Sequence, residues 1–298
     1  MLGAVLAIGV GITLAGCDGA PSAAPPTTKT NIPHQASDVA AIVPLPSGAI
    51  SAAQVQPNGT TWVLSGNSAV KTLTEVDLST KKSEQSVGVS SSAQAVAQSS
   101  TGLLALGLGT ATTGAVELLN GNSASVTGTV AIGAPVRALA FGADGVTLYV
   151  LDGTTTAASV TVINTSTERA VSTFGVPADA IGVAPDPTQT TIWTVEESGN
   201  VQQTSLQSTK PIQQFALGSP GIALAIAPNS GTLYVLKGNQ AASNIDLIST
   251  ATDTVDRVIG AAANSVGLVA SISGTTLYDV VGSPTLGNIQ AISLAPGA

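Results

Sequence analysis

The residue types that most often carry out chemistry are scarce in this sequence, which holds one cysteine, Cys17, and one histidine, His34. A nucleophile needs a neighbouring base, and a zinc ion needs several His or Cys ligands, all positioned by a folded domain. Cys17 and His34 both precede residue 38, ahead of the repeated region described below. We therefore predict no catalytic residue and no metal site, and a single cysteine excludes an internal disulfide.

Two residues of opposite charge could bind a ligand without catalysis. Arg137 and Asp179 lie 42 residues apart. A guanidinium can hold a carboxylate or a phosphate through two parallel hydrogen bonds. If the fold brings positions at this separation together, the two side chains can form an ion pair or hold a polar ligand. We take them as the candidate binding residues.

The composition limits the partners of this chain. Charged residues make up 9% of it, apolar residues 44%, and the net charge is −8. Without a basic stripe, the chain is not expected to bind nucleic acid, and an acidic lipid surface would repel it. No apolar run of about 18 residues follows Cys17, so we expect no transmembrane helix there. Aromatic residues make up 3%, too few to stack a quinone, and we predict no cofactor.

Cys17 has a different use, because it ends an apolar segment. Residues 2–15 are uncharged, have the length of a signal-peptide core, and finish in Leu14-Ala15-Gly16-Cys17. This tetrapeptide resembles the lipobox of bacterial lipoproteins. The resemblance implies that residues 1–16 are a lipoprotein signal peptide and that Cys17 becomes a lipid-modified N-terminus. It also implies a protein anchored by lipid to the cell membrane and facing outside the cytoplasm.

Residues 17–37 contain this cysteine and a stretch rich in Pro, Ala and Thr. Such residues bury too little apolar area to offset the entropy of ordering, so we predict a disordered tether. The basic residues that usually open a signal peptide are absent, and we expect the true start codon to lie further upstream.

Residues 38–298 contain a repeat. Five aromatic residues and one aliphatic substitute recur at spacings of 41 to 44 residues, namely Trp62, Ala105, Tyr149, Trp193, Tyr234 and Tyr278. Each of these anchors follows a turn sequence and precedes a glycine, and alternating β-branched strands come next. A period of about 40–45 residues with four strands is that of a propeller blade. The sequence predicts an all-β fold, a single β-propeller with six four-stranded blades.

Two of these repeats also resemble a known family. Leu148-Tyr149-Val150, Leu233-Tyr234-Val235 and the stretch from Ser159 to Thr165 resemble the YVTN-type, YncE-like propeller repeats. The resemblance covers about residues 38–294 and implies the fold, whereas propellers host unrelated activities.

The two ends of the repeat region predict how the ring closes. The sixth repeat stops after its third strand, near residues 288–294, and residues 39–45 form an orphan strand before the first repeat. We predict that this N-terminal strand completes the last blade and so removes an open sheet edge.

Innermost strands line the central channel of a propeller, and their first residues form one mouth of it. Arg137 and Asp179 fall at such entries, whereas the other entries are mostly small or apolar: Ile50, Ala93, Gln94, Ile222, Ser265 and Val266. Metal-dependent lactonases gather several carboxylates and amides around one cation, and the inner strands offer only Asp179 and Asn264.

We therefore predict a monomeric, non-catalytic binding or scaffold module for a protein, a peptide or a cell-envelope component. Two alternatives stay open. One is an enzyme of lactonase or oxidoreductase type, and the other is a purely structural or adhesive surface protein.

Overall fold

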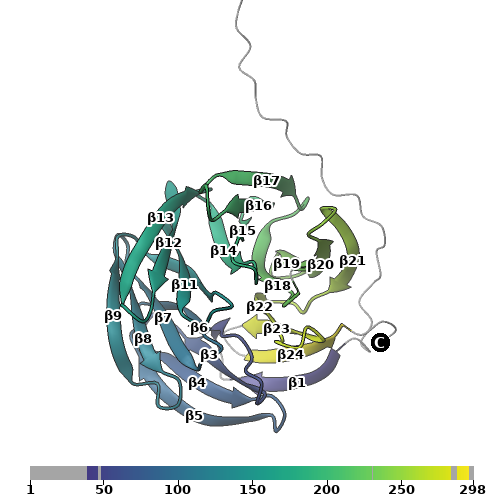
Figure 1. Cartoon of the computed structure of the whole chain (residues 1–298). Helices are drawn as coiled ribbons and strands as arrows, with labels where there is room; N and C mark the ends of the chain where they lie inside the picture. The colour runs from purple at the N-terminus through teal and green to yellow at the C-terminus, as the bar shows by residue number, and fades with distance from the viewer. Residues whose placement is uncertain (1–38, 46–47, 230, 283–286, 295–298) are drawn as a thin grey trace, which may run out of the picture.

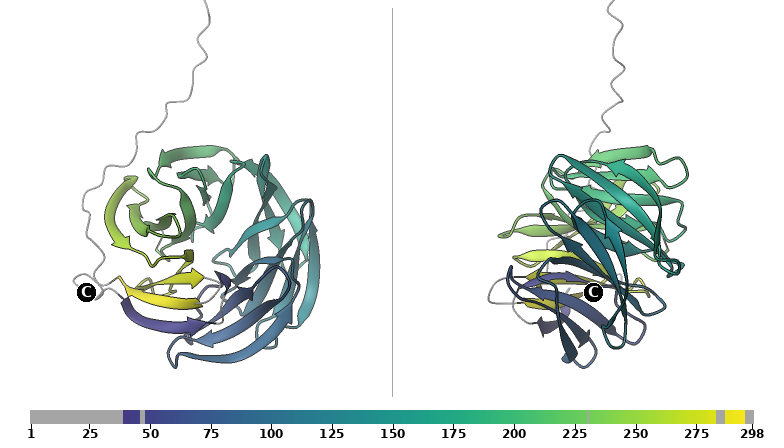
Figure 2. Two further views of the ribbon diagram at one scale, coloured as in Figure 1. Left: turned by 180° about the vertical axis from the view of Figure 1, so that it is seen from behind. Right: turned by 90° about the vertical axis from the view of Figure 1, so that its left-hand side faces the viewer.

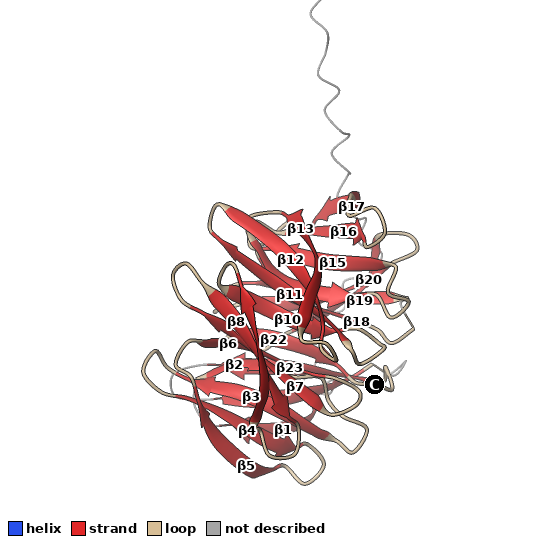
Figure 3. Ribbon diagram, turned by 60° about the vertical axis from the view of Figure 1, so that its left-hand side comes forward, coloured by secondary structure: helices blue, strands red, loops and turns tan. Residues whose placement is uncertain are grey.

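The computed structural model describes residues 39–45, 48–229, 231–282 and 287–294. The predicted signal peptide, Cys17 and tether lie outside these residues. Every regular element within them is a β-strand, and the 24 strands form six four-stranded sheets around one axis (Figures 1 and 2). Neighbouring strands within each sheet are antiparallel, and no helix occurs among the described residues (Figure 3). The predicted six-bladed β-propeller is confirmed.

Five blades each use four consecutive strands, and the sixth takes its outer strand from the N-terminal end of the described chain. Blades I and II contain β2 (Ala49–Ala52), β3 (Thr60–Gly66), β4 (Lys71–Asp77) and β5 (Lys82–Val89), then β6 (Ala93–Gln98), β7 (Leu103–Gly109), β8 (Gly114–Asn120) and β9 (Val126–Ile132). Blades III and IV contain β10 (Val136–Phe141), β11 (Thr147–Thr154), β12 (Ala157–Asn164) and β13 (Arg169–Val176), then β14 (Ala180–Pro185), β15 (Thr191–Glu196), β16 (Asn200–Ser205) and β17 (Pro211–Ala216). Blades V and VI contain β18 (Gly221–Ile226), β19 (Thr232–Gly238), β20 (Ser243–Ser249) and β21 (Thr254–Gly260), then β22 (Ser265–Ala270), β23 (Thr276–Gly282), β24 (Gly287–Ser293) and β1 (Val39–Leu45).

The second strand of each blade carries the repeated anchor residue. Trp62, Tyr149, Trp193 and Tyr234 are at most 4% exposed. Successive side chains of a strand point to opposite faces, and a neighbouring blade covers each face, so these strands are buried along most of their length. Gly66 and Gly238 end two of these strands, because the hairpin that follows each of them needs positive φ. At Gly66 φ is 133°, and a Cβ there would collide with the carbonyl of Val70.

The N-terminal strand closes the ring as predicted. β1 pairs antiparallel with β24, with Val43 opposite Ile289 and Leu45 opposite Gly287. In Figure 1 the first strand (purple) lies beside the last one (yellow). Val43 is 2% exposed and packs in a cluster with Val63, Val280 and Ile289. The ladder therefore holds β1 in blade VI, and the shared core packs blade VI against blade I.

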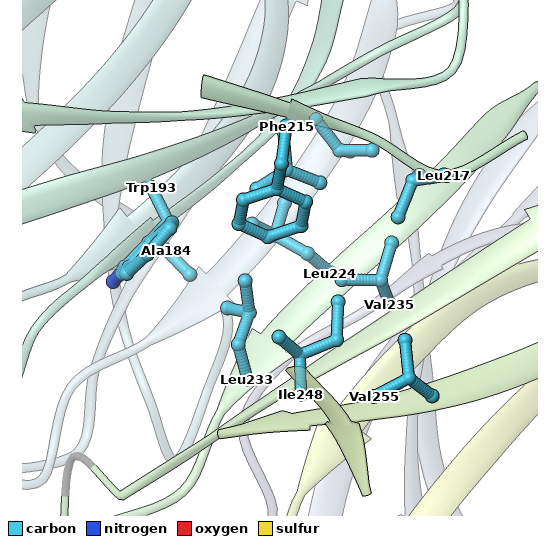
Figure 4. Close-up of a cluster of buried hydrophobic side chains, with 11 residues drawn as sticks. Ala184, Trp193, Phe215, Leu217, Leu224, Leu233, Val235, Ile248 and Val255 are labelled. Atoms are coloured by element: carbon cyan, nitrogen blue, oxygen red, sulfur yellow. The ribbon is translucent and has the colours of Figure 1, made fainter. Parts of the chain in front are cut away.

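The hydrophobic core lies between blades rather than within one of them. In the cluster drawn in Figure 4, Trp193 and Phe215 of blade IV pack with Leu233 and Ile248 of blade V. The two aromatic rings are tilted by 59°, with centroids 6.2 Å apart. Each blade thus depends on its neighbours to bury its apolar faces.

A bulge interrupts the outer strand of every blade. Each ladder between the third and the outer strand skips one residue of the outer strand, and the skipped residues are Ala40, Glu84, Thr127, Val171, Ile212 and Asp256. Bulges twist and disrupt a sheet edge, which blocks pairing with another chain. This feature protects six exposed edges, and no sequence pattern predicted it.

Candidate functional site

A second ring of bulges lies on the innermost strands. The register of each inner strand against the second strand skips one residue, and a bulge of this kind redirects a side chain. The skipped residues are Ile50, Gln94, Arg137, Ile181, Ile222 and Val266. All of them line one central cavity of about 150 Å³. They form a collar inside the channel, in which Arg137 is the charged member.

The spacing of the repeats suggested that Asp179 is the blade IV counterpart of Arg137, but the structure contradicts this. That place belongs to Ile181, and Asp179 lies just before β14. The two predicted residues nevertheless line the same larger cavity of about 510 Å³ at this mouth of the channel. Its lining spans blades II, III and IV and also includes Gln94 and Glu197.

Arg137 holds the backbone beside Asp179 rather than its carboxylate. The Nη1 atom of Arg137 donates hydrogen bonds of 2.8 Å to the carbonyls of Ala178 and Ala180, the two residues that flank Asp179. The carboxylate of Asp179 accepts a 3.0 Å bond from the backbone N–H of Ser198. These two bonds fix the guanidinium at the mouth and link blade III to blade IV. The Nε and Nη2 atoms of Arg137 carry its remaining N–H donors, on the edge of the guanidinium away from these carbonyls.

The carboxyl group of Asp179 is acidic for its type. Burial raises its pKa, but the hydrogen bonds from Ser198 and the charge of Arg137 outweigh burial, so the pKa lies below the usual value of 3.8. Because the folded pKa is depressed, the ionised carboxylate stabilises the fold above the usual pKa. This contribution is lost as the pH falls through the folded value.

Replacing this carboxylate should therefore weaken the acid dependence of stability. We expect Asp179→Asn to lower the free energy of unfolding at pH 7 and to reduce the difference between its values at pH 7 and at pH 3. Urea unfolding of both proteins at the two pH values measures this. An identical pH dependence in the variant would contradict the assignment.

The opposite mouth of the channel has a different character. The last residues of the inner strands and the turns after them surround a cavity of about 330 Å³. None of the described residues that line it is charged, and most are apolar, including Phe141, Ile226 and Ile272. The channel is thus polar and charged at one end and apolar at the other.

Sequence reasoning missed several charged residues that are buried or half-buried in the blades. Lys237 and Asp246 form an ion pair of 2.6 Å, and Lys237 also donates to the carbonyl of Leu217. Burial raises the pKa of Asp246 more than the ion pair with Lys237 lowers it. Asp152 accepts hydrogen bonds from Ser159 and Thr161 in its own blade. Their sequence positions could have indicated these residues, because Asp152 and Lys237 each lie three residues after a tyrosine anchor.

These charged residues lie on separate blades, Asp152 on blade III and the pair of Lys237 and Asp246 on blade V. In the part of the chain that the structure describes, no group of three or more His, Cys, Asp or Glu side chains is arranged to hold a metal ion. The same residues also include no helix with the length and hydropathy needed to span a membrane. Polar side chains such as Asp152 are instead satisfied by partners on adjacent strands, so they tie strands together.

Fold and site together define a six-bladed β-propeller with a chemically asymmetric channel. No family model matches the chain, and no curated protein matches it. Among solved structures, the one described as the structure of U3-55K is similar, with a TM-score of 0.66 and 13% identity over 88% of this chain and 100% of that one. The WD40 repeats of RRP9 give a TM-score of 0.66 with 12% identity, over 87% of this chain and 98% of that one.

A third similar structure belongs to an enzyme, hydrazine synthase from Kuenenia stuttgartiensis. Its TM-score is 0.61 with 17% identity, over 78% of this chain and 73% of that one. At such low identity these similarities establish a WD40-like propeller fold, and the fold alone carries no activity.

Proposed function

We propose that this protein is a non-catalytic binding module of the cell envelope, with its partner held at the charged mouth of the channel. The observation that carries the proposal is the 510 Å³ cavity lined by Arg137, Asp179 and Glu197. Concave sites with a few fixed polar groups are the usual binding sites of proteins. The two carbonyl bonds to Arg137 fix its guanidinium before any partner arrives, which reduces the entropy lost on binding.

We propose further that the module is a membrane-anchored lipoprotein outside the cytoplasm and a member of the YVTN-type propellers. The lipobox-like sequence before Cys17 and the Tyr-Val anchors support these two assignments. The bound partner is then a protein, a peptide or another envelope component, and the propeller acts as a monomer.

Lipid on Cys17 would determine where the protein is found. We expect Cys17→Ser to move the protein from the membrane fraction to the soluble fraction, or to leave it unprocessed, because dual acylation is what makes such anchoring durable. Fractionation of cells that express each form, with detergent partitioning, measures this. Unchanged partitioning of the variant would rule out the lipid anchor.

Arg137→Ala should reduce partner binding in a protein that is still folded. The two charge-assisted bonds of Arg137 to backbone carbonyls contribute up to about 3–6 kcal/mol, so a urea unfolding curve of the variant accompanies the binding assay. We expect Arg137→Ala to lose most of the partner captured by crosslinking in the native envelope, as measured by mass spectrometry. The matched control Arg169→Ala removes an exposed arginine on β13 and should capture normally. Full capture by both Arg137→Ala and Asp179→Ala would place the site elsewhere.

A further inference from the structure

The charged mouth of the channel contains opposite charges that do not pair directly. The Nη1 atom of Arg137 is bonded to two backbone carbonyls, and the carboxylate of Asp179 accepts a backbone N–H, so the two side chains form no ion pair with each other. No described residue accepts a hydrogen bond from the Nε or Nη2 atom of Arg137. Because Arg137 is only half-buried, these donors are available to a ligand.

Two carboxylates lie beside each other on the blade IV side of this mouth. The backbone N–H of Glu197 donates a 3.0 Å bond to the carbonyl of Asp179, which holds the two residues together. The side chain of Glu197 is exposed, and the carboxyl group of Asp179, with its depressed pKa, is ionised at neutral pH. Among the described residues that line the 510 Å³ cavity, the charged ones are therefore one cation and two anions.

This combination of charges restricts the chemistry of a ligand. A purely anionic molecule would meet Arg137 but also face two carboxylates, and a purely cationic one would face the guanidinium. A phosphate ester carries a charge of about −1.5 to −2, more than one guanidinium offsets beside two carboxylates. A molecule with one carboxylate and one ammonium matches the mouth, because the guanidinium can bind the carboxylate and the two acids can bind the ammonium.

The rest of the cavity suits the groups of a peptide. Gln94 and Thr155 line it and are exposed, so their amide and hydroxyl groups can bond to peptide N–H and C=O groups. Pro135 and Ile181 line it as well and offer apolar contacts to small side chains. At about 30 Å³ per water-sized group, the cavity has room for about 17 such groups, roughly a peptide of three small residues.

We propose that the charged mouth binds a short zwitterionic peptide, about three residues long, whose two termini are both free. Its terminal carboxylate binds the guanidinium of Arg137, and its terminal ammonium binds the carboxylates of Asp179 and Glu197. This inference rests on the proposed function, because it names the ligand class for the same channel mouth.

Calorimetric titration of the full chain carrying Cys17→Ser tests the proposal with trialanine as the probe. Trialanine should bind at about one molecule per chain with a Kd below about 1 mM. N-acetyl-trialanine lacks the ammonium and trialanine amide lacks the carboxylate. Each should bind at least about tenfold more weakly, because a charge-assisted interaction is lost. Free alanine, which leaves most of the cavity unfilled, and phosphoethanolamine, which carries a phosphate, should also bind more weakly than trialanine.

Two variants assign each end of the peptide to its protein group. Arg137→Gln should bind trialanine and its amide equally, because the group that distinguishes them is gone, and should still prefer trialanine to its N-acetyl form. Glu197→Gln should keep the preference for the free carboxylate and reduce the preference for the free ammonium by about threefold or more. The matched controls Arg169→Gln and Glu84→Gln, both at exposed positions of outer strands, should leave both preferences unchanged.

A urea unfolding curve of each variant confirms that it is folded, and Glu197→Gln, at an exposed side chain, remains decisive if Arg137→Gln is not folded. The proposal is overturned if trialanine does not bind, if a peptide blocked at either end binds as tightly, or if free alanine or phosphoethanolamine binds as tightly. Unchanged preferences in Glu197→Gln would also overturn it. If peptide binding fails while envelope crosslinking still depends on Arg137, the proposed function stands and the ligand class is wrong. If crosslinking is independent of Arg137 as well, both fail.

Discussion

Deletion of residues 38–45 should cause a large loss of stability and visible aggregation. The deletion removes β1, leaves β24 with an unpaired edge, and exposes the apolar face that Val43 covers. Burial of a valine of this kind alone contributes about 1.5–3 kcal/mol, and the lost ladder adds to this. An exposed β24 is also a template for pairing with other chains.

Differential scanning calorimetry with light scattering measures both effects. A deletion of residues 18–37 is the matched control, because it shortens the chain by a longer segment but retains β1. We expect the control to melt like the full chain. If the chain without residues 38–45 melts at the same temperature as the control, the ring does not depend on this closure.

A pair of neighbouring substitutions separates the role of β1 packing from the presence of the strand. Val43 is 2% exposed and Ile42 is 52% exposed, since adjacent residues of a strand face opposite ways. In the same assay, Val43→Asp buries an unpaired charge and should resemble the deletion, whereas Ile42→Asp should be tolerated.

Trp193→Ala should lower the free energy of unfolding by about 3–5 kcal/mol, the range for large buried aromatic residues. Trp193 is 1% exposed and fills the space between blades IV and V against Phe215. Because blades are stabilised mainly by their neighbours, the cavity would weaken the contact of two sheets at once. Urea unfolding at neutral pH measures the change.

Two further variants show whether packing is the cause. The indole Nε1 atom of Trp193 is buried with no hydrogen-bond partner among the described residues, so Trp193→Phe should cost much less than Trp193→Ala. Val171→Ala, on an outer strand where the side chain is 62% exposed, should stay within about 0.5 kcal/mol of the wild type. Equal losses for Trp193→Ala and Val171→Ala would contradict the interblade core.

The fold was predictable from the sequence because its signals are local and repeated. The anchors at Trp62, Tyr149 and Trp193 recur with the blade period and fall on second strands, as expected. The closure of the ring by β1 was also predictable, because the sixth repeat lacked its outer strand and the predicted strand at residues 39–45 belonged to no repeat.

The site was less predictable, because it depends on contacts between segments far apart in the sequence. A bulge changes the pairing register by one residue, and no property of Ile181 alone distinguishes it from a regular strand residue. The spacing of repeats therefore selected Asp179 for that place. The bonds from Arg137 to the carbonyls of Ala178 and Ala180 depend on the approach of two blades, and so does the bond from Lys237 to the carbonyl of Leu217.

Site-specific photo-crosslinking in the native envelope tests most directly whether the partner binds at the charged mouth. A photoreactive residue replaces Gln94, an exposed member of the collar, or Val171, an exposed residue of an outer strand. We predict a specific adduct from position 94 that disappears when Arg137→Ala is added, and none from position 171. Adducts from position 171 alone, or an adduct at position 94 that persists with Arg137→Ala, would contradict a binding site at the channel mouth.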